Sequence, residues 1–424
     1  MTAPDDRRPP PAGQAGPQAL SELPGLLKVS KDDPRLVVRG KRTLQLLLPI
    51  ALAGAFAGVV ALLNGHHVMG TTSEIGWGAL IATYVFFAVS STGLCLVSSL
   101  VHVFGFKLFE SVTKPAILLA WVMLTIGFGV IGTELEHPFL LVRWVLLSPN
   151  PHSPIWWMGT LYGLYFTFLT AELFFLIKDD HHKARMAAIP KLVAAVAASA
   201  TLGSVFALNH SRPFWYGPVL PVYLLITALV AGAALITLVV YFKDFFENDG
   251  KVKDEHVPLI VALGKLLLLF IGLLGLTTAV RVIFGVNGEH THLYEVTMAQ
   301  LSGPLFFSFW FFEVGLAMAV PAFILLSSRG KEPRFVAMAA SLPLMALLVM
   351  RYNMVYAGQA FSLKPVVGHL GEKLIYGPPF KGNVAGFLEY TPSLVEVGIV
   401  AGAVAGAVLL FVAAARAFRM LKEV

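Results

Sequence analysis

The sequence predicts an all-α protein that crosses a membrane about ten times. Of its 424 residues, 57% are hydrophobic and only 13% are charged. Successive apolar runs of about 20 residues or more are each long enough to span the hydrocarbon core as a helix. The runs are too long and too uniformly apolar for the alternating strands of a membrane barrel.

Residues 1–38 are rich in Pro, Gly, Ala and charge, without apolar periodicity, and predict a disordered cytoplasmic segment. Residues 39–424 are predicted to form one integral membrane domain. The first apolar run begins only near Leu44, after a basic cluster, so no cleavable signal is expected. The predicted spans are Leu44–Leu63, Gly78–Phe106, Lys114–Thr133, Pro154–Ile177, Ile189–Leu208, Pro218–Phe242, Pro258–Val286, Ser302–Ser327, Arg334–Tyr356 and Ser393–Leu421.

Basic residues are concentrated in alternate loops. One set of loops carries Arg39/Lys41/Arg42, Lys107/Lys114, Lys178/Lys183/Arg185, Lys243/Lys251/Lys253, Arg329/Lys331/Arg334 and Arg416/Arg419/Lys422. The opposite set holds mainly Arg143, Arg212, Lys364, Lys373 and Lys381. Because Lys and Arg collect on cytoplasmic loops, this alternation predicts ten spans with both termini cytoplasmic. It also accounts for the basic excess, so no nucleic-acid partner is expected. On the outer side, the long Ala357–Pro392 loop is a candidate docking surface.

The chain offers few ligands for a resident redox centre. Its single cysteine, Cys95, excludes an intrachain disulfide and a cysteine-ligated iron–sulfur or zinc site within this chain. Nearly all twelve histidines fall in loops or at span ends, and His102 is the closest exception. Since a b-type haem needs histidines inside facing spans, we expect neither haem nor iron–sulfur cluster here.

The stretch from Glu134 to Trp157, ELEHPFLLVRWVLLSPNPHSPIWW, has an unusual number of polar groups for a loop between two apolar runs. His137, with Glu134 and Glu136, lies at the outer end of the third span. Such groups can accept the two protons that a quinol loses with its two electrons. The alternative is a solvated loop in which His-Pro simply ends a helix.

Two spans of the first half carry polar groups. Glu172 is predicted toward the cytoplasmic side of the fourth span, where it either relays protons or reaches the lipid head groups. The second span has a stripe at helical spacing, formed by Tyr84, Ser91, Cys95, Ser98 and His102. With Gly93, this stripe suits close helix packing, and a proton path along it is the alternative.

The second half carries charges inside its spans. Glu313 is predicted near the midplane of the eighth span, where it is costly unless paired or protonated. Lys265 is its expected partner by residue type. Arg281 and Arg351 lie in the outer parts of spans seven and nine. These charges indicate either ion pairs that hold helices together or a second proton route.

These features together resemble the polysulfide-reductase membrane-subunit family (NrfD/PsrC type). The loop matches its acid-x-x-His-Pro segment, the following arginine and the Ser-Pro-Asn-Pro-x-Ser-Pro turn before a Trp-rich helix. SSTGLCLVSSLVHVFG (Ser90–Gly105) is similar to the family's small-residue second helix. RYNMVYAGQ (Arg351–Gln359) is similar to its Arg-x-x-x-Val-x-Gly-Gly-Gln element, with Ala357 replacing the first Gly. HPFLLVR departs from the common His-Pro-Glu-Arg, so the usual acid–base pair after the proline is absent.

The resemblance implies a haem-free quinone-reactive subunit in a bacterial inner (cytoplasmic) membrane, with menaquinone or ubiquinone as substrate. It implies a ferredoxin-like iron–sulfur partner, often joined to a molybdopterin enzyme or multihaem cytochrome. The ten-span branch of the family has two four-helix bundles flanked by extra helices. His137 matches the histidine expected at the quinone pocket, where Tyr84 or Trp157 are possible wall residues. Glu172 and Arg351 match the acid of the following helix and the arginine of the late element.

Two other functions stay open. One is a membrane anchor, with or without proton translocation, that binds no quinone. The other is a secondary transporter with broken helices near the midplane, which only Pro304 and Pro321 on either side of Glu313 favour.

Overall fold

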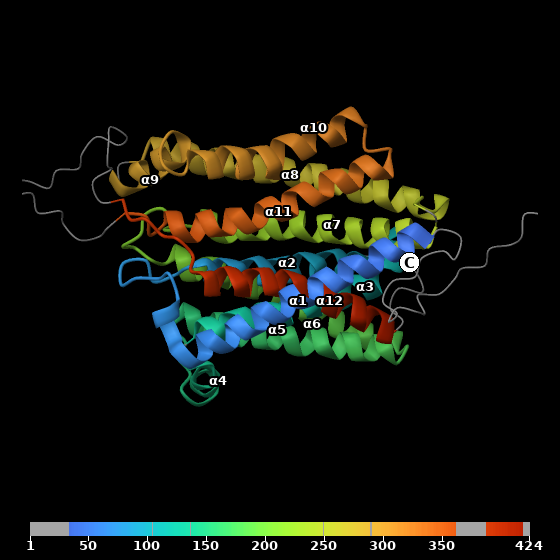
Figure 1. The fold of residues 1–424 in the computed structure, drawn as a ribbon, viewed down its shortest axis with the longest axis horizontal. Coiled ribbons are helices and arrows are strands. Elements are labelled where there is room, and N and C mark those ends of the chain that lie inside the picture. Colours follow the sequence, from blue (N-terminus) through green and yellow to red (C-terminus); the bar gives the residue numbers. More distant parts are fainter. Residues whose placement is uncertain are drawn as a thin grey trace, which may run out of the picture.

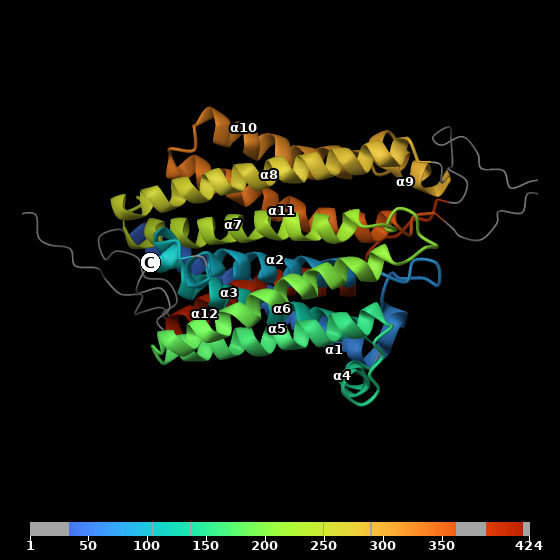
Figure 2. The same cartoon turned by 180° about the vertical axis from the view of Figure 1, so that it is seen from behind.

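The computed structural model is a bundle of long helices that run side by side (Figure 1; Figure 2). It describes residues 34–103, 105–135, 137–248, 250–288, 291–361 and 387–418, without the side chains of residues 34–44, 102, 142, 144 and 291. Within these ranges, ten helices are long and apolar enough to cross a membrane. The prediction of a ten-span all-α membrane protein is therefore confirmed. No strand forms in these ranges beyond an isolated bridge between Phe361 and Phe387.

The long helices follow the predicted spans in order. They are α1 (Pro34–Asn64), α2 (Ala79–His102), α3 (Glu110–Glu134), α5 (Pro154–Ile177), α6 (His181–Ala207), α7 (Val219–Glu247), α8 (Val257–Val286), the π-helix η4 (Ser308–Ala319) continued by α10 (Val320–Ser327), α11 (Pro333–Ala357) and α12 (Leu394–Ala417). Short 3₁₀ turns occupy Gly65–Val68, Lys107–Phe109 and Asp254–His256.

Two helices lie where the sequence predicted loops. They are α4 (Pro138–Leu147) and α9 (Thr291–Leu301), and the loop assignment of these residues was wrong. Each is too short to cross the bilayer, so neither stood out as an apolar run of spanning length. Proline at the start of α4 suits a first helical turn, because its missing N–H would have no partner there anyway.

The helices form two groups that meet along α2 and α7. One group comprises α2, α3, α5 and α6, and the other comprises α7, α8, η4–α10 and α11. The pair α1 and α12 packs together and lies against α3 (Figure 1). This is the predicted arrangement of two four-helix bundles with flanking helices.

Glycines set the closest helix contacts. A Cβ on Gly93 of α2 would lie 1.8 Å from the carbonyl oxygen of Ala228 on α7. A Cβ on Gly232 of α7 would likewise lie 2.3 Å from the carbonyl group of Gly93. A Cβ on Gly54 of α1 would lie 2.4 Å from the Cα of Gly402 on α12. In a membrane, where packing rather than water drives helix association, such contacts hold neighbouring backbones together.

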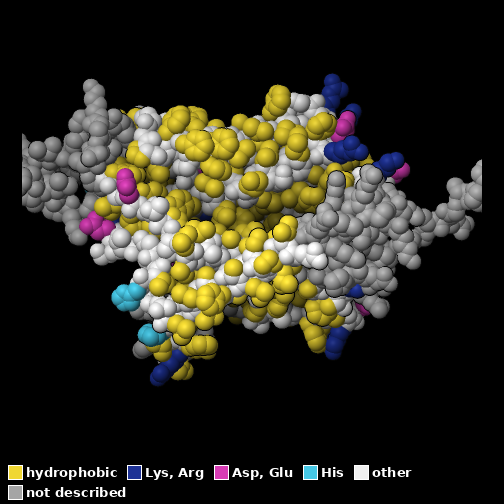
Figure 3. Space-filling view, viewed as in Figure 1, with side chains coloured by type: hydrophobic (Ala, Val, Ile, Leu, Met, Phe, Trp, Pro, Cys, Tyr) yellow, Lys and Arg dark blue, Asp and Glu magenta, His cyan; other side chains and the backbone are white. Residues whose placement is uncertain are grey.

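The molecule has two ends of different character. We call the end where α2 and α5 finish the basic face, and the end where α3 finishes the His137 face. In Figure 3 the Lys and Arg side chains gather mainly at the basic face, and the visible histidines lie at the opposite end. Several predictions fall outside the described residues: the segment 1–33, the loop residues 362–386, Glu136 and the side chain of His102.

Candidate functional site

His137 and Glu134 lie together where α3 ends at the His137 face. The helix finishes at Glu134, and Leu135 is already extended. Pro138 favours this ending, because a residue that precedes proline avoids the helical conformation. The His137 side chain is exposed, whereas Glu134 is only 5% exposed and its Oε2 has no hydrogen-bond partner among the described residues. An accessible imidazole thus lies three residues from a buried carboxyl group.

A second buried acid, Glu396 of α12, lies close enough for its charge to act on Glu134. Glu396 is fully buried and accepts hydrogen bonds from the backbone N–H of Gly70 at 2.7 Å and of Ser393 at 2.8 Å. The Tyr390 hydroxyl donates to its other oxygen at 2.6 Å. Sequence reasoning missed this residue. The Ser-x-x-Glu capping box that opens α12 was the available signal.

The tryptophans after the loop lock its turn. The Trp156 indole donates to the Val145 carbonyl, and the Trp157 indole donates to the Pro151 carbonyl, both at 2.9 Å. Trp157 is 42% exposed, whereas Tyr84 is buried in the first bundle with its ring centroid 6.2 Å from that of Tyr162. The structure therefore does not bring Tyr84 and Trp157 to one common wall.

Glu172 forms a fully buried ion pair with Lys191 of α6. Their charged atoms are 2.6 Å apart, and both side chains are 0% exposed. The Lys191 ammonium also donates to the Ser98 hydroxyl at 2.9 Å. The alternative in which Glu172 reaches the lipid head groups is wrong, because its side chain points into the bundle. Lys191 was missed, although a lysine inside an alanine-rich predicted span was a signal.

Hydroxyl groups line the first bundle beyond this ion pair. The Ser91 hydroxyl is 2.8 Å from that of Tyr165, and the Tyr162 hydroxyl is 3.3 Å from that of Ser199. Ser199 in turn lies 2.7 Å from the Thr92 hydroxyl. The polar stripe of α2 therefore faces α5 and α6 and supplies groups that can exchange protons.

Glu313 lies in the π-helix η4 and is 1% exposed. Asn353 Nδ2 donates to its Oε1 at 2.8 Å, and Arg281 Nη2 approaches its Oε2 at 3.4 Å. The predicted pairing with Lys265 is wrong. Lys265 is exposed and lies sixteen residues before Arg281 on α8, about 24 Å along the axis at 1.5 Å per residue.

Arg351 is buried where the two bundles meet. Its side chain is 2% exposed, and its Nη2 donates to the Thr227 hydroxyl of α7. Its Nε and Nη1 have no hydrogen-bond partner among the described residues. Its charge acts on Tyr162 in one bundle and Tyr223 in the other. Arg351 therefore links the polar interiors of the bundles rather than the loop that carries His137.

Gly358 and Gln359, at the end of the RYNMVYAGQ stretch that begins with Arg351, have structural roles. Gln359 exchanges hydrogen bonds with both backbone groups of Trp77, at 3.1 and 3.0 Å. A Cβ on Gly358 would lie 2.0 Å from the Trp215 ring. The Gly-Gln pair thus fastens the end of α11 to the segments that precede α2 and α7.

Comparison with known proteins adds a family and named relatives. The family described as "Polysulphide reductase, NrfD" matches residues 67–363. The chain is 25% identical to a selenate reductase subunit of Mesobacillus selenatarsenatis, over 85% of this chain and 90% of that protein. It is 25% identical to the Hdr-like menaquinol oxidoreductase integral membrane subunit of Archaeoglobus fulgidus, over 89% and 93%. A putative dimethyl sulfoxide reductase membrane subunit of Halobacterium salinarum is also 25% identical, over 89% and 91%.

Proposed function

Because the chain belongs to the NrfD polysulphide reductase family, we propose that it is the quinone-reactive membrane subunit of a respiratory oxidoreductase complex. It is haem-free and oxidises a quinol, or reduces a quinone, of the menaquinone or ubiquinone type. It exchanges electrons with a ferredoxin-like iron–sulfur subunit, and through it with a molybdopterin enzyme or multihaem cytochrome. One relative is named as a menaquinol oxidoreductase integral membrane subunit, and two as subunits of reductases.

The observation that carries this proposal is that the exposed His137 follows three residues after the buried Glu134, at the end of a membrane span. A quinol that becomes a quinone releases two electrons and two protons. The exposed imidazole of His137 accepts the first proton, and the buried carboxylate of Glu134 accepts the second. The electrons pass to the iron–sulfur subunit, which docks on the His137 face. In the opposite direction the same groups supply the protons.

The proposal includes a membrane orientation. The basic face lies in the cytoplasm of a bacterial cell, as the positive-inside rule implies, and the His137 face lies outside the inner membrane. Protons released at His137 then leave on the outer side. The residues 39–424 form the membrane domain.

A second candidate function is proton transfer through the first bundle. The buried Glu172–Lys191 pair lies toward the basic face, and the hydroxyls of Tyr165 and Ser91 continue along the interior. Buried ionisable residues in membrane spans are rare and commonly mark proton relays. We propose that this row connects the cytoplasmic side with the bundle interior.

The test is quinol oxidation by the purified complex, with menadiol as the quinol and His137→Ala as the variant. Loss of a general base is expected to lower turnover by about 10²–10⁴-fold. His152→Ala is the matched control, because His152 is also exposed and lies in the same inter-span segment. Equal turnover of the two variants would contradict the role of His137. A complex that binds no menadiol would instead identify the chain as an anchor.

A further inference from the structure

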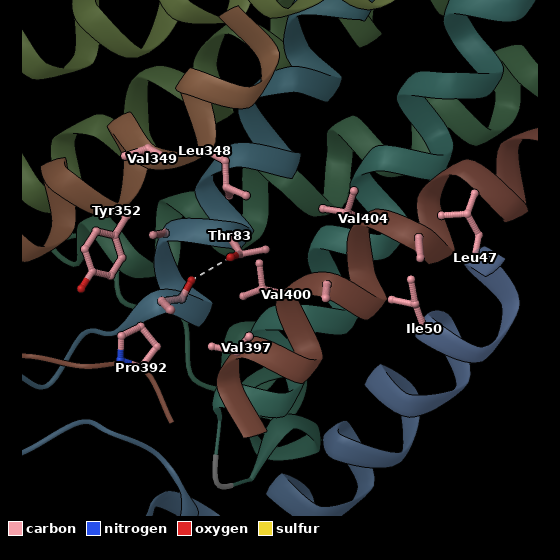
Figure 4. A pocket seen from close by; sticks show the side chains of 14 residues that line it. Leu47, Ile50, Thr83, Leu348, Val349, Tyr352, Pro392, Val397, Val400 and Val404 are labelled. Atoms are coloured by element: carbon pink, nitrogen blue, oxygen red, sulfur yellow. Dashed lines mark hydrogen bonds between the residues drawn. The ribbon is translucent and has the colours of Figure 1, made fainter. Parts of the chain in front are cut away.

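An apolar groove of about 580 Å³ lies between α11 and α12 (Figure 4). The floor of the groove is formed by Ala79, Ala82 and Thr83 of α2, and α1 closes its far end with Leu47 and Ile50. None of its lining residues is charged. The Thr83 hydroxyl donates to the Ala79 carbonyl at 2.8 Å, so this side chain offers the groove no free donor.

The groove is long enough to hold an extended apolar chain. It runs along α12 from Pro392 to Ala405, roughly 20 Å at 1.5 Å per residue.

One end of the groove has a different chemistry. Tyr352 lines it there, with its ring stacked on Tyr390 at 5.9 Å and its hydroxyl donating to the Tyr390 carbonyl at 3.2 Å. The Tyr390 hydroxyl donates in turn to the buried Glu396. This end lies near the His137 face, about 8 Å inside the end of α11.

The uncharged, aromatic lining at this end of the groove favours some membrane lipids over others. An anionic phospholipid head group calls for Lys or Arg, and the groove lining supplies neither. A neutral ring can pack against Tyr352, while a long apolar tail follows Val397, Val400 and Val404 of α12. Among lipids, this combination of neutral aromatic head and long branched tail fits an isoprenoid quinone.

We propose that the groove between α11 and α12 is a second binding site for an isoprenoid quinone, with the ring beside Tyr352 and the tail along α12. The identity of the lipid rests on the proposed function. The groove lining contains neither His137 nor Glu134, so the groove is a different site from the one proposed above.

The experiment uses the full complex in vesicles and a menaquinone that carries a photoreactive diazirine in its isoprenoid tail. Illumination is expected to label peptides of α12 and α1, and excess unlabelled menaquinone to prevent the labelling. Ala401 is exposed and lines the groove, so Ala401→Trp fills it without disturbing the interior. Labelling should fall about tenfold, as expected for loss of roughly two buried methylene contacts.

The matched control is Ala279→Trp. Ala279 is an exposed alanine that lines another apolar groove, of about 470 Å³, between α8 and η4, whose lining contains no tyrosine. This variant should leave labelling of α12 unchanged. Equal labelling of both grooves, displacement by phosphatidylglycerol instead of menaquinone, or absence of labelling on α12 would each overturn the proposal.

The two proposals fail in different ways. Menadiol has no isoprenoid tail, so its oxidation reports the His137 site alone. Menadiol turnover without labelling of α12 would remove the second site and leave the proposed function intact. Loss of both would remove the proposed function, and the identity of the groove's lipid with it.

Discussion

Each bundle contains a buried ion pair that joins two of its spans, and these two pairs are built differently. In the first bundle, Glu172 and Lys191 are 2.6 Å apart and both are 0% exposed. In the second, Glu313 and Arg281 are 3.4 Å apart, and Asn353 also donates to Glu313 at 2.8 Å. The Arg281 guanidinium lies over the Tyr223 ring at 5.0 Å and over the Phe214 ring at 5.3 Å. The second acid is thus held by several groups, and the first chiefly by one.

The bases differ in what they can do. A buried lysine can lose its proton, so Glu172 and Lys191 can interconvert between a charged and a neutral pair. Arginine stays protonated, and its planar guanidinium holds Glu313 and the neighbouring rings in a fixed arrangement. From this difference we expect proton exchange in the first bundle and a fixed charge in the second.

Breaking the two pairs should have unequal effects on stability. Lys191→Met leaves Glu172 buried opposite an apolar side chain, which is expected to cost about 3–5 kcal/mol of unfolding free energy. Arg281→Met should cost less, about 1–3 kcal/mol, because Asn353 still donates to Glu313. Unfolding of the purified protein in detergent measures both values.

The control for this experiment is the double variant Glu172→Gln/Lys191→Met. It removes both charges, so most of the stability lost in Lys191→Met should return. Equal costs for Lys191→Met and Arg281→Met would show that the two pairs do not differ in the way their geometry indicates.

The two pairs should also differ in their effect on activity, and loss of the acid in the first bundle should again have the larger effect. Glu172→Gln keeps the size of the side chain but cannot exchange a proton, so proton transfer from the basic face into the first bundle should fall by about 10²-fold. Glu313→Gln keeps one acceptor oxygen, for Asn353 or for Arg281, and is expected to change turnover by less than about threefold. The measurements are the proton flux at the basic face of vesicles during quinol oxidation and the quinol turnover itself. A larger loss for Glu313→Gln would reverse the assignment of roles.

Another acid–base pair lies outside the spans, on α9, and should give the smallest effect. Glu295 Oε2 is 3.4 Å from His292 Nδ1, and burial raises the pKa of Glu295 more than His292 lowers it. A raised folded-state pKa means that this contribution to stability is present below the unfolded pKa, about 4.3 for Glu, and is lost as pH rises through the folded pKa.

Amide hydrogen-exchange protection of α9 should therefore decrease as pH rises from mildly acidic to neutral. Glu295→Gln cannot titrate and should remove this part of the pH dependence. Persistence of the same slope in the variant would assign the effect to other groups.

Some parts of the site could be predicted from the sequence, and others could not. That α3 ends before His137 and Pro138 followed from the sequence, because proline disfavours the helical conformation in the residue directly before it. The partner of Glu313 did not, since Lys265 and Arg281 lie on the same helix and residue type alone cannot say which one lies level with Glu313. Glu396 was missed because its partners come from Gly70 and Tyr390, and Gly70 is more than 300 residues away.

The sequence by itself determined the ten spans and their order, because the length of an apolar run and the thickness of a bilayer are both one-dimensional quantities. Only the tertiary structure decided which buried charges meet. Rotation and register of each helix are set by close contacts such as that of Gly93 with Gly232, which join helices distant in the sequence. The same packing opens the groove beside α12, whose walls come from four separate helices.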